Sequence, residues 1–575
     1  MAVLTKNALE ILNERYFLKD SRGHSIETAV QLFKRVAKYV ATAEKENSLY
    51  WEKHFFQVMN NLDFLPNSPT LMNAGLPNGQ LSACFVLPIE DSLQSIFTTL
   101  KNAALIHQSG GGTGFNFSNL RPKNDLISSS QGASTGPIAF LKIYDAATEY
   151  VKQGGKRRGA NMGILNVSHP DIEEFIASKT SKKELQNFNL SVGISDDFMR
   201  AVDNNLSWNL VNPRTKKTVK IIKAKKLWKN IVQQAWETGD PGLLFLDTIN
   251  KANPTPKLGD IQSTNPCGEV PLIAYESCNL GSINLAQMLL TSNTECRLDW
   301  EKLKTTISIA VRFLDDIISV NHYVIPENKN ITSNNRKIGL GVMGWAEMLL
   351  KLNLPYASQK AIDLGDKIMH FIQENSYRVS QELALEKGEF PEWKNSIYFP
   401  NTKLRNATCN SIAPTGTISI IANTSYSIEP LYALAFKRSG ILNGKKQFEI
   451  NRFFKEKMKN LGLWDKKIEQ TILKTGSIQQ VQGLPKNLKK LFETSLEIPW
   501  KIHLLHQKAF QKHVDNAVSK TINLPENSDV KEISKIYKTA YLYKLKGITI
   551  YRNGSKLNQV LQPCSYNSLT SNCQL

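Results

Sequence analysis

The chain lacks any run of apolar residues that approaches the roughly 18 a helix needs to cross a bilayer. Its amino terminus places Glu10 and Glu14 inside the apolar pattern, which is not the pattern of a secretory signal peptide. Internal repeats and low-complexity blocks are also missing. These absences exclude the membrane, secreted and repeat classes and predict a cytoplasmic protein.

Cysteine is scarce, with seven in 575 residues, and the number is odd. A disulfide framework is therefore excluded, and thiols in a reducing compartment are expected to be catalytic rather than structural. Cys296 and Cys409 are interpreted as small apolar residues. The other five fall where a dithiol reductase would need them: Cys84, Cys267, Cys278, Cys564 and Cys573.

Acidic residues are outnumbered, with 51 against 71 basic ones, so the net charge is +20. Such an excess attracts nucleic acid or phosphorylated small molecules, or it reflects solvated lysine faces. The densest basic run, 214–229, alternates lysines with Val219, Ile221 and Ile222. This pattern predicts a surface strand leading into a helix. It lacks the aromatic residues of a single-strand binder, so no nucleic-acid partner is expected.

The apolar periodicity predicts three parts. Residues 1–62 are expected to be helical, since Ala29, Leu32, Phe33 and Val36 recur at helical spacing. Residues 63–556 alternate short strands with amphipathic helices and form the expected catalytic domain, with a lysine-rich helical insertion at about 441–520. The Ser/Asn-rich end, 557–575, is expected to be a flexible tail.

Short apolar runs bounded by Gly, Pro or Asn predict strands over 82–87, 163–167, 242–246, 417–422 and 547–551. Helices are predicted over 92–107, with Leu93, Ile96, Phe97 and Leu100 on one face, and over 300–320. Strands separated by helices favour an α/β fold with a largely parallel sheet, open or closed into a barrel.

The most informative motif is Asn265-Pro266-Cys267-Gly268-Glu269. A thiol hydrogen is easily abstracted, so the cysteine can become a sulfur radical that takes hydrogen from carbon. Glu269 can act as a general base for an adjacent hydroxyl, and Asn265 can hold that hydroxyl. A cysteine pair can supply two electrons and end as a disulfide, which a mobile dithiol can reduce by exchange.

These residues, with Cys278 in ESCNLGSINL and Cys84 in LSACFVLP, resemble the catalytic core of ribonucleotide reductase. The resemblance implies a ten-stranded α/β barrel with the radical cysteine on an internal finger loop, preceded by a small helical region. It covers nearly the whole chain and continues through the segments 67–75, 110–115, 153–163, 239–245, 413–430 and 547–555.

The resemblance implies a role for each motif residue. Cys267 becomes the thiyl radical that abstracts the 3′ hydrogen of the ribose, Glu269 takes the 3′ hydroxyl proton, and Asn265 hydrogen-bonds the ribose hydroxyls. Cys84 and Cys278 reduce the sugar as the 2′ hydroxyl leaves as water.

The same resemblance implies that Cys564 and Cys573 reduce the resulting disulfide and are themselves restored by a thioredoxin-type reductant. The two tail cysteines are separated by eight residues. They are usually closer in the family, and the wider spacing loses the strained geometry of a short loop.

The resemblance also implies substrate and effector sites. Hydroxyls and backbone N–H groups of a glycine-containing turn commonly hold phosphate. The expected substrate-binding residues are Ser68, Thr70, Ala83, Gly112, Pro414, Thr415, Gly416, Thr417 and Ile418. A deoxynucleotide or ATP effector is expected at Asp91, Ser92, Leu93 and Arg121, with the segments 121–137 and 186–193 linking it to the substrate in a homodimer.

Residues 547–556 indicate which radical source the chain uses. Tyr551 is flanked by Ile550 and Arg552, so the tyrosine pair of the two-subunit enzymes is missing. The stretch resembles the adenosylcobalamin-dependent subfamily, and diphosphate substrates are expected. The motif for cobalamin bound without its own base is incomplete, because Leu105 stands where aspartate is required.

Two alternatives remain open at this stage. One is the large catalytic subunit of a class I enzyme that needs a separate metal-radical subunit. The other is a nucleotide- or nucleic-acid-binding protein that kept the fold and lost activity.

Two further motifs give little evidence of a binding site. The glycines at 339, 341 and 344 match the letters of a dinucleotide fingerprint but follow no convincing strand. The pair His503 and His506 has no further ligand in range, so no metal site is predicted.

Overall fold

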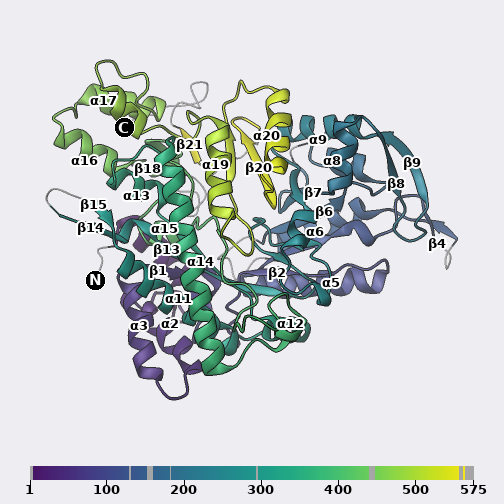
Figure 1. Ribbon diagram of the computed structural model, residues 1–575, viewed down its shortest axis with the longest axis horizontal. Helices are drawn as coiled ribbons and strands as arrows, with labels where there is room; N and C mark the ends of the chain where they lie inside the picture. Colours follow the sequence, from purple (N-terminus) through teal and green to yellow (C-terminus); the bar gives the residue numbers. More distant parts are fainter. Residues whose placement is uncertain are drawn as a thin grey trace.

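The amino-terminal region is helical, as predicted. The computed structural model describes residues 4–127, 131–151, 159–181, 183–292, 296–438, 447–555 and 561–563. The first elements are α1 (Lys6–Ile11), the π-helix η1 (Leu12–Tyr16), α2 (Ala29–Val40) and α3 (Ser48–Asn60). A capping box between Thr28 and Gln31 fixes the start of α2, whose Leu32, Phe33 and Val36 are buried. In Figure 1, α2 and α3 lie beside α11 (Trp300–Val320).

Ten strands form one mixed sheet. Their bounds are β1 (Phe64–Pro66), β2 (Cys84–Val86), β3 (Gly112–Asn116), β6 (Asn161–Asn166), β7 (Phe188–Ile194), β10 (Gly242–Phe245), β13 (Ser277–Asn284), β16 (Ile338–Met343), β19 (Thr521–Leu524) and β20 (Gly547–Arg552). The strand order is β1-β13-β2-β3-β6-β7-β10-β20-β19, and β16 also pairs with β13. The α/β class and the ten-stranded sheet are confirmed.

Parallel pairing joins the strands within three groups. β2, β3, β6, β7 and β10 form one parallel group, and the pairs β13–β16 and β19–β20 are also parallel. The groups meet in antiparallel pairs at β2–β13 and β10–β20.

The segment 409–412 connects the two outer parts of this arrangement. Leu340 of β16 donates its amide to the Cys409 carbonyl at 2.7 Å, and Ile412 donates to the Ala517 carbonyl at 3.1 Å, just before β19. The sheet is therefore bridged back toward its beginning, as a barrel requires.

A hairpin lies inside the sheet. Its strands are β11 (Ser263–Thr264) and β12 (Pro271–Leu272), paired antiparallel, and its tip is 265–270. Gly114 of β3 permits the close approach, because a Cβ there would lie 1.7 Å from the Thr264 carbonyl oxygen. Asn116 and Asn189 donate side-chain amides to the carbonyls of Gln262 and Pro266, both at 2.8 Å. The finger loop is thus held by the surrounding strands.

The prediction of a strand over 417–422 is wrong. Residues Ile418–Ile421 form the short helix α15. The run of isoleucines is typical of a strand, yet Ile418 and Ile421, three apart, are both buried, and helical spacing buries them together. The other four predicted strands correspond to β2, β6, β10 and β20.

The predicted helix over 92–107 is α5 (Leu93–Ser109), and the one over 300–320 is α11. The apolar face of α5 is only partly covered: Ile96 is buried, whereas Leu93 is 64% and Phe97 49% exposed. The basic run forms the exposed strand β9 (Thr218–Lys223) followed by α9 (Ala224–Thr238), as predicted.

Helices α16 (Arg452–Asn460), α17 (Lys466–Thr475) and α18 (Lys486–Leu491) share a small apolar core that includes Phe454, Ile472 and Phe492. Figure 1 shows α16 and α17 far from the hairpin of β8 (Ser207–Val211) and β9. The next helix, α19 (Trp500–Gln511), packs instead against the long helix α14 (Gln359–Lys387) beside the sheet.

The glycine fingerprint is part of a strand and not a nucleotide-binding turn. Gly339 and Gly341 lie within β16, where a Cβ at Gly341 would lie 2.2 Å from the Ser411 carbonyl oxygen. His503 and His506 are buried on α19 and contact backbone carbonyls. Within the described ranges, no three His, Cys, Asp or Glu side chains gather as a ligand set, and no helix is long and apolar enough to span a membrane.

Gly114→Ala is expected to lower the free energy of unfolding by about 1–3 kcal/mol, because the added methyl meets backbone that a side-chain rotation cannot move. Chemical denaturation measures the change. The matched control is Gly163→Ala in β6, where the methyl would meet only side chains at 3.0–3.2 Å. Equal stability of the two variants would contradict the backbone clash.

Candidate active site

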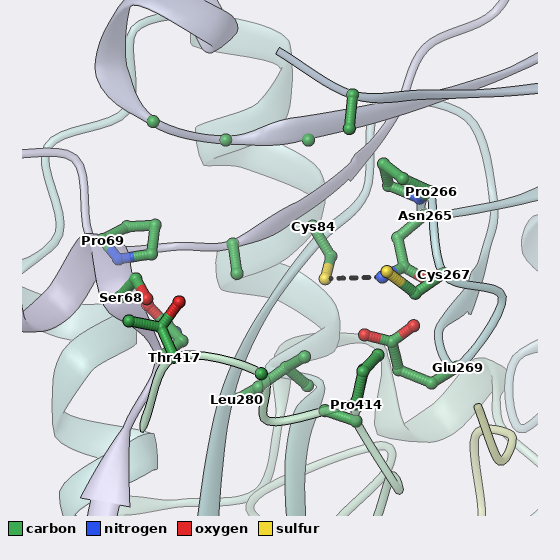
Figure 2. A pocket seen from close by; sticks show the side chains of 18 of the residues that line it. Ser68, Pro69, Cys84, Asn265, Pro266, Cys267, Glu269, Leu280, Pro414 and Thr417 are labelled. Carbon is green, nitrogen blue, oxygen red and sulfur yellow. Dashed lines mark hydrogen bonds between the residues drawn. The ribbon is translucent and has the colours of Figure 1, made fainter. Parts of the chain in front are cut away.

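The tip of the finger loop faces a cavity of about 240 Å³. Three parts of the chain supply its walls: the start of α4 (Ser68–Asn73), the glycine turn 110–112 before β3, and the turn 413–418. Figure 2 shows Cys84, Asn265, Cys267 and Glu269 on one side, with Ser68 and Thr417 across from them. Most side chains that the sequence singled out therefore meet at one cavity.

Cys84 and Cys278 lie directly opposite each other on β2 and β13. Opposite residues of antiparallel strands have Cα atoms about 4.5–5.5 Å apart, which is the separation a disulfide needs. Both thiols are free and buried. Their opposed positions are therefore compatible with a disulfide between them.

Asn265 connects the finger to this pair. Its Nδ2 donates to the Cys84 sulfur at 3.1 Å, drawn as the dashed line in Figure 2, while its Oδ1 accepts from the Val270 amide at 3.0 Å. Burial raises the pKa of the Cys84 thiol well above its ordinary value, with Glu269 adding to the rise and the Asn265 hydrogen bond opposing it. Cys84 is thus kept as a protonated thiol.

Hydrogen bonds to its backbone carbonyl fix the position of Glu269. Its carbonyl accepts from the Ala517 amide at 2.8 Å and from the Ser411 hydroxyl at 2.9 Å. In Figure 2 the carboxylate points toward the cysteines. The residue is nearly fully buried, so its carboxylate acts in a low-dielectric setting.

Cys267 occupies the tip of the finger and is exposed. Gly268 beside it has φ +81°, a left-handed conformation that favours glycine and sharpens the tip. The exposed thiol of Cys267 faces the cavity. Cys267 is therefore the thiol of this group most open to a bound molecule.

The turn 413–418 borders the same cavity, with Thr415 at φ +56°. The Thr415 hydroxyl accepts from the Ser427 amide at 2.8 Å, which fixes the turn. The amides of Ser419, Ile420 and Ile421 donate to the carbonyls of Thr415 and Thr417, so the short helix α15 is closed onto this turn. Ser68, Ala83 and Gly112 also line the cavity.

Thr70 is placed differently. It is fully buried within α4, and its hydroxyl donates to the Leu81 carbonyl at 3.0 Å, away from the cavity wall. Its position two residues after Ser68 on a helix explains why it turns inward.

Comparison with known proteins identifies the family. The ribonucleotide reductase barrel domain matches residues 82–404 and 401–551, and the all-alpha domain of the same family matches residues 2–79. The chain belongs to the ribonucleotide reductase family.

Relatives within this family are similar over almost the whole chain. The Vitamin B12-dependent ribonucleoside-diphosphate reductases of Thermoplasma acidophilum and Mycobacterium tuberculosis are each 47% identical, over 97% of this chain and 80% of their own. The Ribonucleoside-diphosphate reductase subunit alpha of Chlamydia pneumoniae is 31% identical over 93% of this chain and 58% of its own. The Actinobacillus ureae class Id ribonucleotide reductase alpha subunit superposes with a TM-score of 0.79 and 25% identity, covering 96% of this chain and 97% of that one.

A second cavity of this reductase-family chain, of about 570 Å³, shares the finger tip with the first. Pro266, Cys267 and Gly268 line it, together with residues of β10, β20 and the segment before β19. Cys267 thus stands between two cavities, one on each side of the loop.

The effector residues expected from the family gather at the start of α5. Ser92 caps the helix by accepting from the Ser95 amide at 3.2 Å. Asp91 accepts from the backbone amide and the Nε of Arg121 at 3.0 and 2.8 Å. With the exposed Leu93 beside them, these residues form one surface that is separate from both cavities.

The sequence reasoning missed several residues at the cavities. His107 lines the first one, where burial lowers its pKa to about 4 and Thr113 Oγ1 lies 2.9 Å from its Nε2. Arg15 and Lys520 line the second. Neither spacing nor composition marks these residues, because each reaches its cavity from a distant segment.

The tail cysteines Cys564 and Cys573 lie outside the described residues. Their proposed role in reducing the disulfide stays a prediction.

Asn265→Ala is expected to slow alkylation of Cys84 by about tenfold at neutral pH. The hydrogen bond from Asn265 lowers the Cys84 pKa. Its loss raises that pKa, so a smaller fraction of Cys84 is present as the reactive thiolate. Iodoacetamide labelling followed by peptide mapping measures the rate. Cys267 in the same variant is the internal control, and unchanged labelling of Cys84 would contradict the assignment.

Proposed function

We propose that this chain reduces ribonucleoside diphosphates to 2′-deoxyribonucleoside diphosphates by thiyl-radical chemistry, with adenosylcobalamin as the radical source. The observation that carries the proposal is the opposed pair Cys84–Cys278 facing the finger that bears Asn265, Cys267 and Glu269. The 47% identical relatives named as Vitamin B12-dependent ribonucleoside-diphosphate reductases support the substrate and the cofactor.

The proposed reaction begins at Cys267. Its sulfur radical takes the 3′ hydrogen of the ribose, because it is the exposed thiol at the finger tip. Glu269 accepts the 3′ hydroxyl proton, and Asn265 hydrogen-bonds the sugar hydroxyls from the same loop.

The cysteine pair then supplies the reducing equivalents. Cys84 and Cys278 together lose two hydrogen atoms and form a disulfide, the 2′ hydroxyl leaves as water, and Cys267 returns the 3′ hydrogen. Because the pKa of each buried thiol is raised, both are protonated before the reaction and can donate hydrogen.

The diphosphate is proposed to bind the turn 414–418, with Ser68 across the cavity. The Thr417 hydroxyl lines this cavity, and a hydroxyl can donate a hydrogen bond to a phosphate oxygen. Thr70 is left out of this set, since its hydroxyl is bonded inside the protein.

The cofactor is proposed to bind at the second cavity. This cavity is more than twice the volume of the first, at about 570 against 240 Å³, and Cys267 is part of its wall. Ser519, Thr521 and Thr549 offer hydroxyls there, and no tyrosine pair occupies β20. When bound, adenosylcobalamin supplies a carbon radical that converts a thiol to a thiyl radical. The protein's own contribution is to hold Cys267 between cofactor and substrate.

A homodimer with an effector site at the start of α5 completes the proposal. The exposed apolar face of α5 continues onto α6 (Pro137–Tyr150), and no other described element covers it. A second copy of the same face would bury it, as a symmetric interface requires. The exposed side chains of this face are Leu93, Phe97, Leu105, Ile143 and Tyr150. A thioredoxin-type reductant in the cytoplasm would restore the thiols.

Purified protein given a ribonucleoside diphosphate, dithiothreitol and adenosylcobalamin is expected to form deoxyribonucleotide without a second protein. Chromatography of the nucleotides measures the product. Cys267→Ala is the matched control and should lower turnover at least a thousandfold. Activity that appears only with an added metal-radical subunit would favour the class I alternative, and turnover by Cys267→Ala would overturn the radical mechanism.

Phe97→Glu is expected to convert the dimer to a monomer, because it places a charge in the centre of the apolar face of α5 and α6. Sedimentation velocity measures the assembly state. The control is Leu385→Glu on α14, where the native side chain is 83% exposed and lies on a different helix. Dissociation in both variants, or in neither, would contradict this interface.

A further inference from the structure

One carboxylate in the wall of the second cavity is not used by the proposed reaction. Glu429 lines this cavity with its side chain 22% exposed, whereas the side chain of its partner Lys520 is fully buried. Glu429 Oε2 accepts from Lys520 Nζ at 2.5 Å, and Oε1 accepts from the Thr521 amide at 2.8 Å. A carboxylate oxygen can accept more than one hydrogen bond, so Glu429 can also accept from a molecule in the cavity.

Three contacts fix the position of Lys520. Besides Glu429, its Nζ donates to the Thr521 carbonyl at 3.3 Å and lies 3.2 Å from His503 Nδ1. His503 Nε2 is 3.0 Å from the Ser495 carbonyl, which can only accept, so Nε2 carries the proton and Nδ1 accepts from Lys520. Burial lowers the pKa of Lys520, and Glu429 opposes this effect. The donors of the ammonium group are all used inside the protein, so Glu429 keeps one place in the cavity wall.

Hydroxyl groups lie in the same wall as this carboxylate. Thr521 and Thr549 are opposite each other in the parallel pair β19–β20, so their side chains point to the same face, and both residues line the cavity. Ser519 lines it from the segment just before β19. A primary carboxamide has two N–H donors and a carbonyl acceptor. Because the carboxylate accepts and the hydroxyls can donate, this wall is complementary to carboxamide groups.

The second cavity also has bare backbone in its wall. Gly268, next to Cys267 on the finger loop, and Gly416 both line it. Apart from the neighbouring residues in the chain, a Cβ added at either glycine would meet no atom of the described residues within 4 Å. Side chains at these positions would therefore extend into open space. Their absence leaves room beside Cys267 for a large rigid ring, and the corrin ring of cobalamin is such a ring, with acetamide and propionamide groups at its periphery.

We propose that Glu429 is a specificity-determining residue of the second cavity, where it accepts hydrogen bonds from the carboxamide groups around the corrin ring of adenosylcobalamin. This inference rests on the proposed function, which assigns the cofactor to this cavity. Lys520 and the Thr521 amide hold the carboxylate in place. The hydroxyls of Ser519, Thr521 and Thr549 are the donors for the amide carbonyls. A site of this kind selects the amide-bearing cofactor over derivatives that carry carboxylates at the same periphery.

The first test is the double variant Glu429→Gln with Lys520→Met, which removes both charges of the pair together. Equilibrium dialysis against adenosylcobalamin in the dark, read by absorbance, measures the Kd without nucleotide or turnover. The Kd is expected to rise about tenfold, because a hydrogen bond to an ionised acceptor is roughly twice as strong as one between neutral groups. An unchanged Kd would overturn the proposal.

The matched control is Glu347→Gln with Arg452→Met. This pair, with 3.0 Å between Glu347 Oε1 and Arg452 Nη2, also contains a buried glutamate, but neither residue lines the second cavity. The Kd for adenosylcobalamin should stay within twofold of native. An equal rise in both double variants would contradict the assignment of the effect to Glu429.

A second measurement begins with the native chain and does not depend on the folding of the double variant. Adenosylcobalamin derivatives in which one peripheral carboxamide is hydrolysed to a carboxylate are compared with the parent cofactor by the same dialysis. At least one derivative is expected to bind tenfold or more weakly, because its carboxylate would face that of Glu429. Equal binding of all derivatives by the native chain would overturn the proposal.

The single variant Glu429→Gln then assigns the discrimination. It should bind the disfavoured derivative within threefold of the parent cofactor. Asp240 is another carboxylate in the cavity wall, so discrimination that persists in this variant would overturn the role of Glu429.

These outcomes separate the inference from the proposed function. A native chain that binds no adenosylcobalamin would overturn the cofactor assignment and this inference with it. Binding that does not depend on Glu429 would overturn this inference alone.

Discussion

The whole site depends on the close approach of one hairpin to the strands that surround it. The carbonyl of Thr264 lies where the Cβ of any residue other than glycine at 114 would be. Backbone and side-chain donors from Ala517, Ser411 and Asn189 then hold the tip. Because these contacts come from segments far apart in the chain, the finger loop has a fixed place in the walls of both cavities.

This fixed place gives neighbouring thiols different properties. Cys267 is exposed at a sharp turn, whereas Cys84 and Cys278 are buried on rigid strands. Burial raises the pKa of both strand cysteines, so both stay protonated thiols. A loop thiol open to two cavities and a strand pair closed to solvent suit the two proposed roles, radical carrier and reductant.

The polar groups near Cys84 differ from those near Cys278. Asn265 contacts Cys84 from the finger, whereas Glu276, two residues before Cys278, forms a buried ion pair with Lys337. The polar partners therefore differ between the two sulfurs, although the cysteines are opposite each other in the register.

Tertiary packing overrides local sequence patterns at several places, and at one of them the prediction was wrong. The isoleucines at 418, 420 and 421 are typical of a strand, yet they form a helical turn because residues three apart pack inward together. Thr70 has the hydroxyl of a ligand-binding residue but directs it to Leu81. The apolar face of α5 has the periodicity of a core helix, although much of it is exposed.

The sequence by itself determined the family, the α/β class, the helical start of the chain and the residue types of the Cys–Asn–Glu motif. These are local properties, since spacing and motif letters lie within short segments. Only the tertiary structure decided that Cys84 opposes Cys278 and that His107 and Arg15 reach the cavities. Each of these depends on strand register or on contacts between distant segments, which local sequence patterns do not reveal.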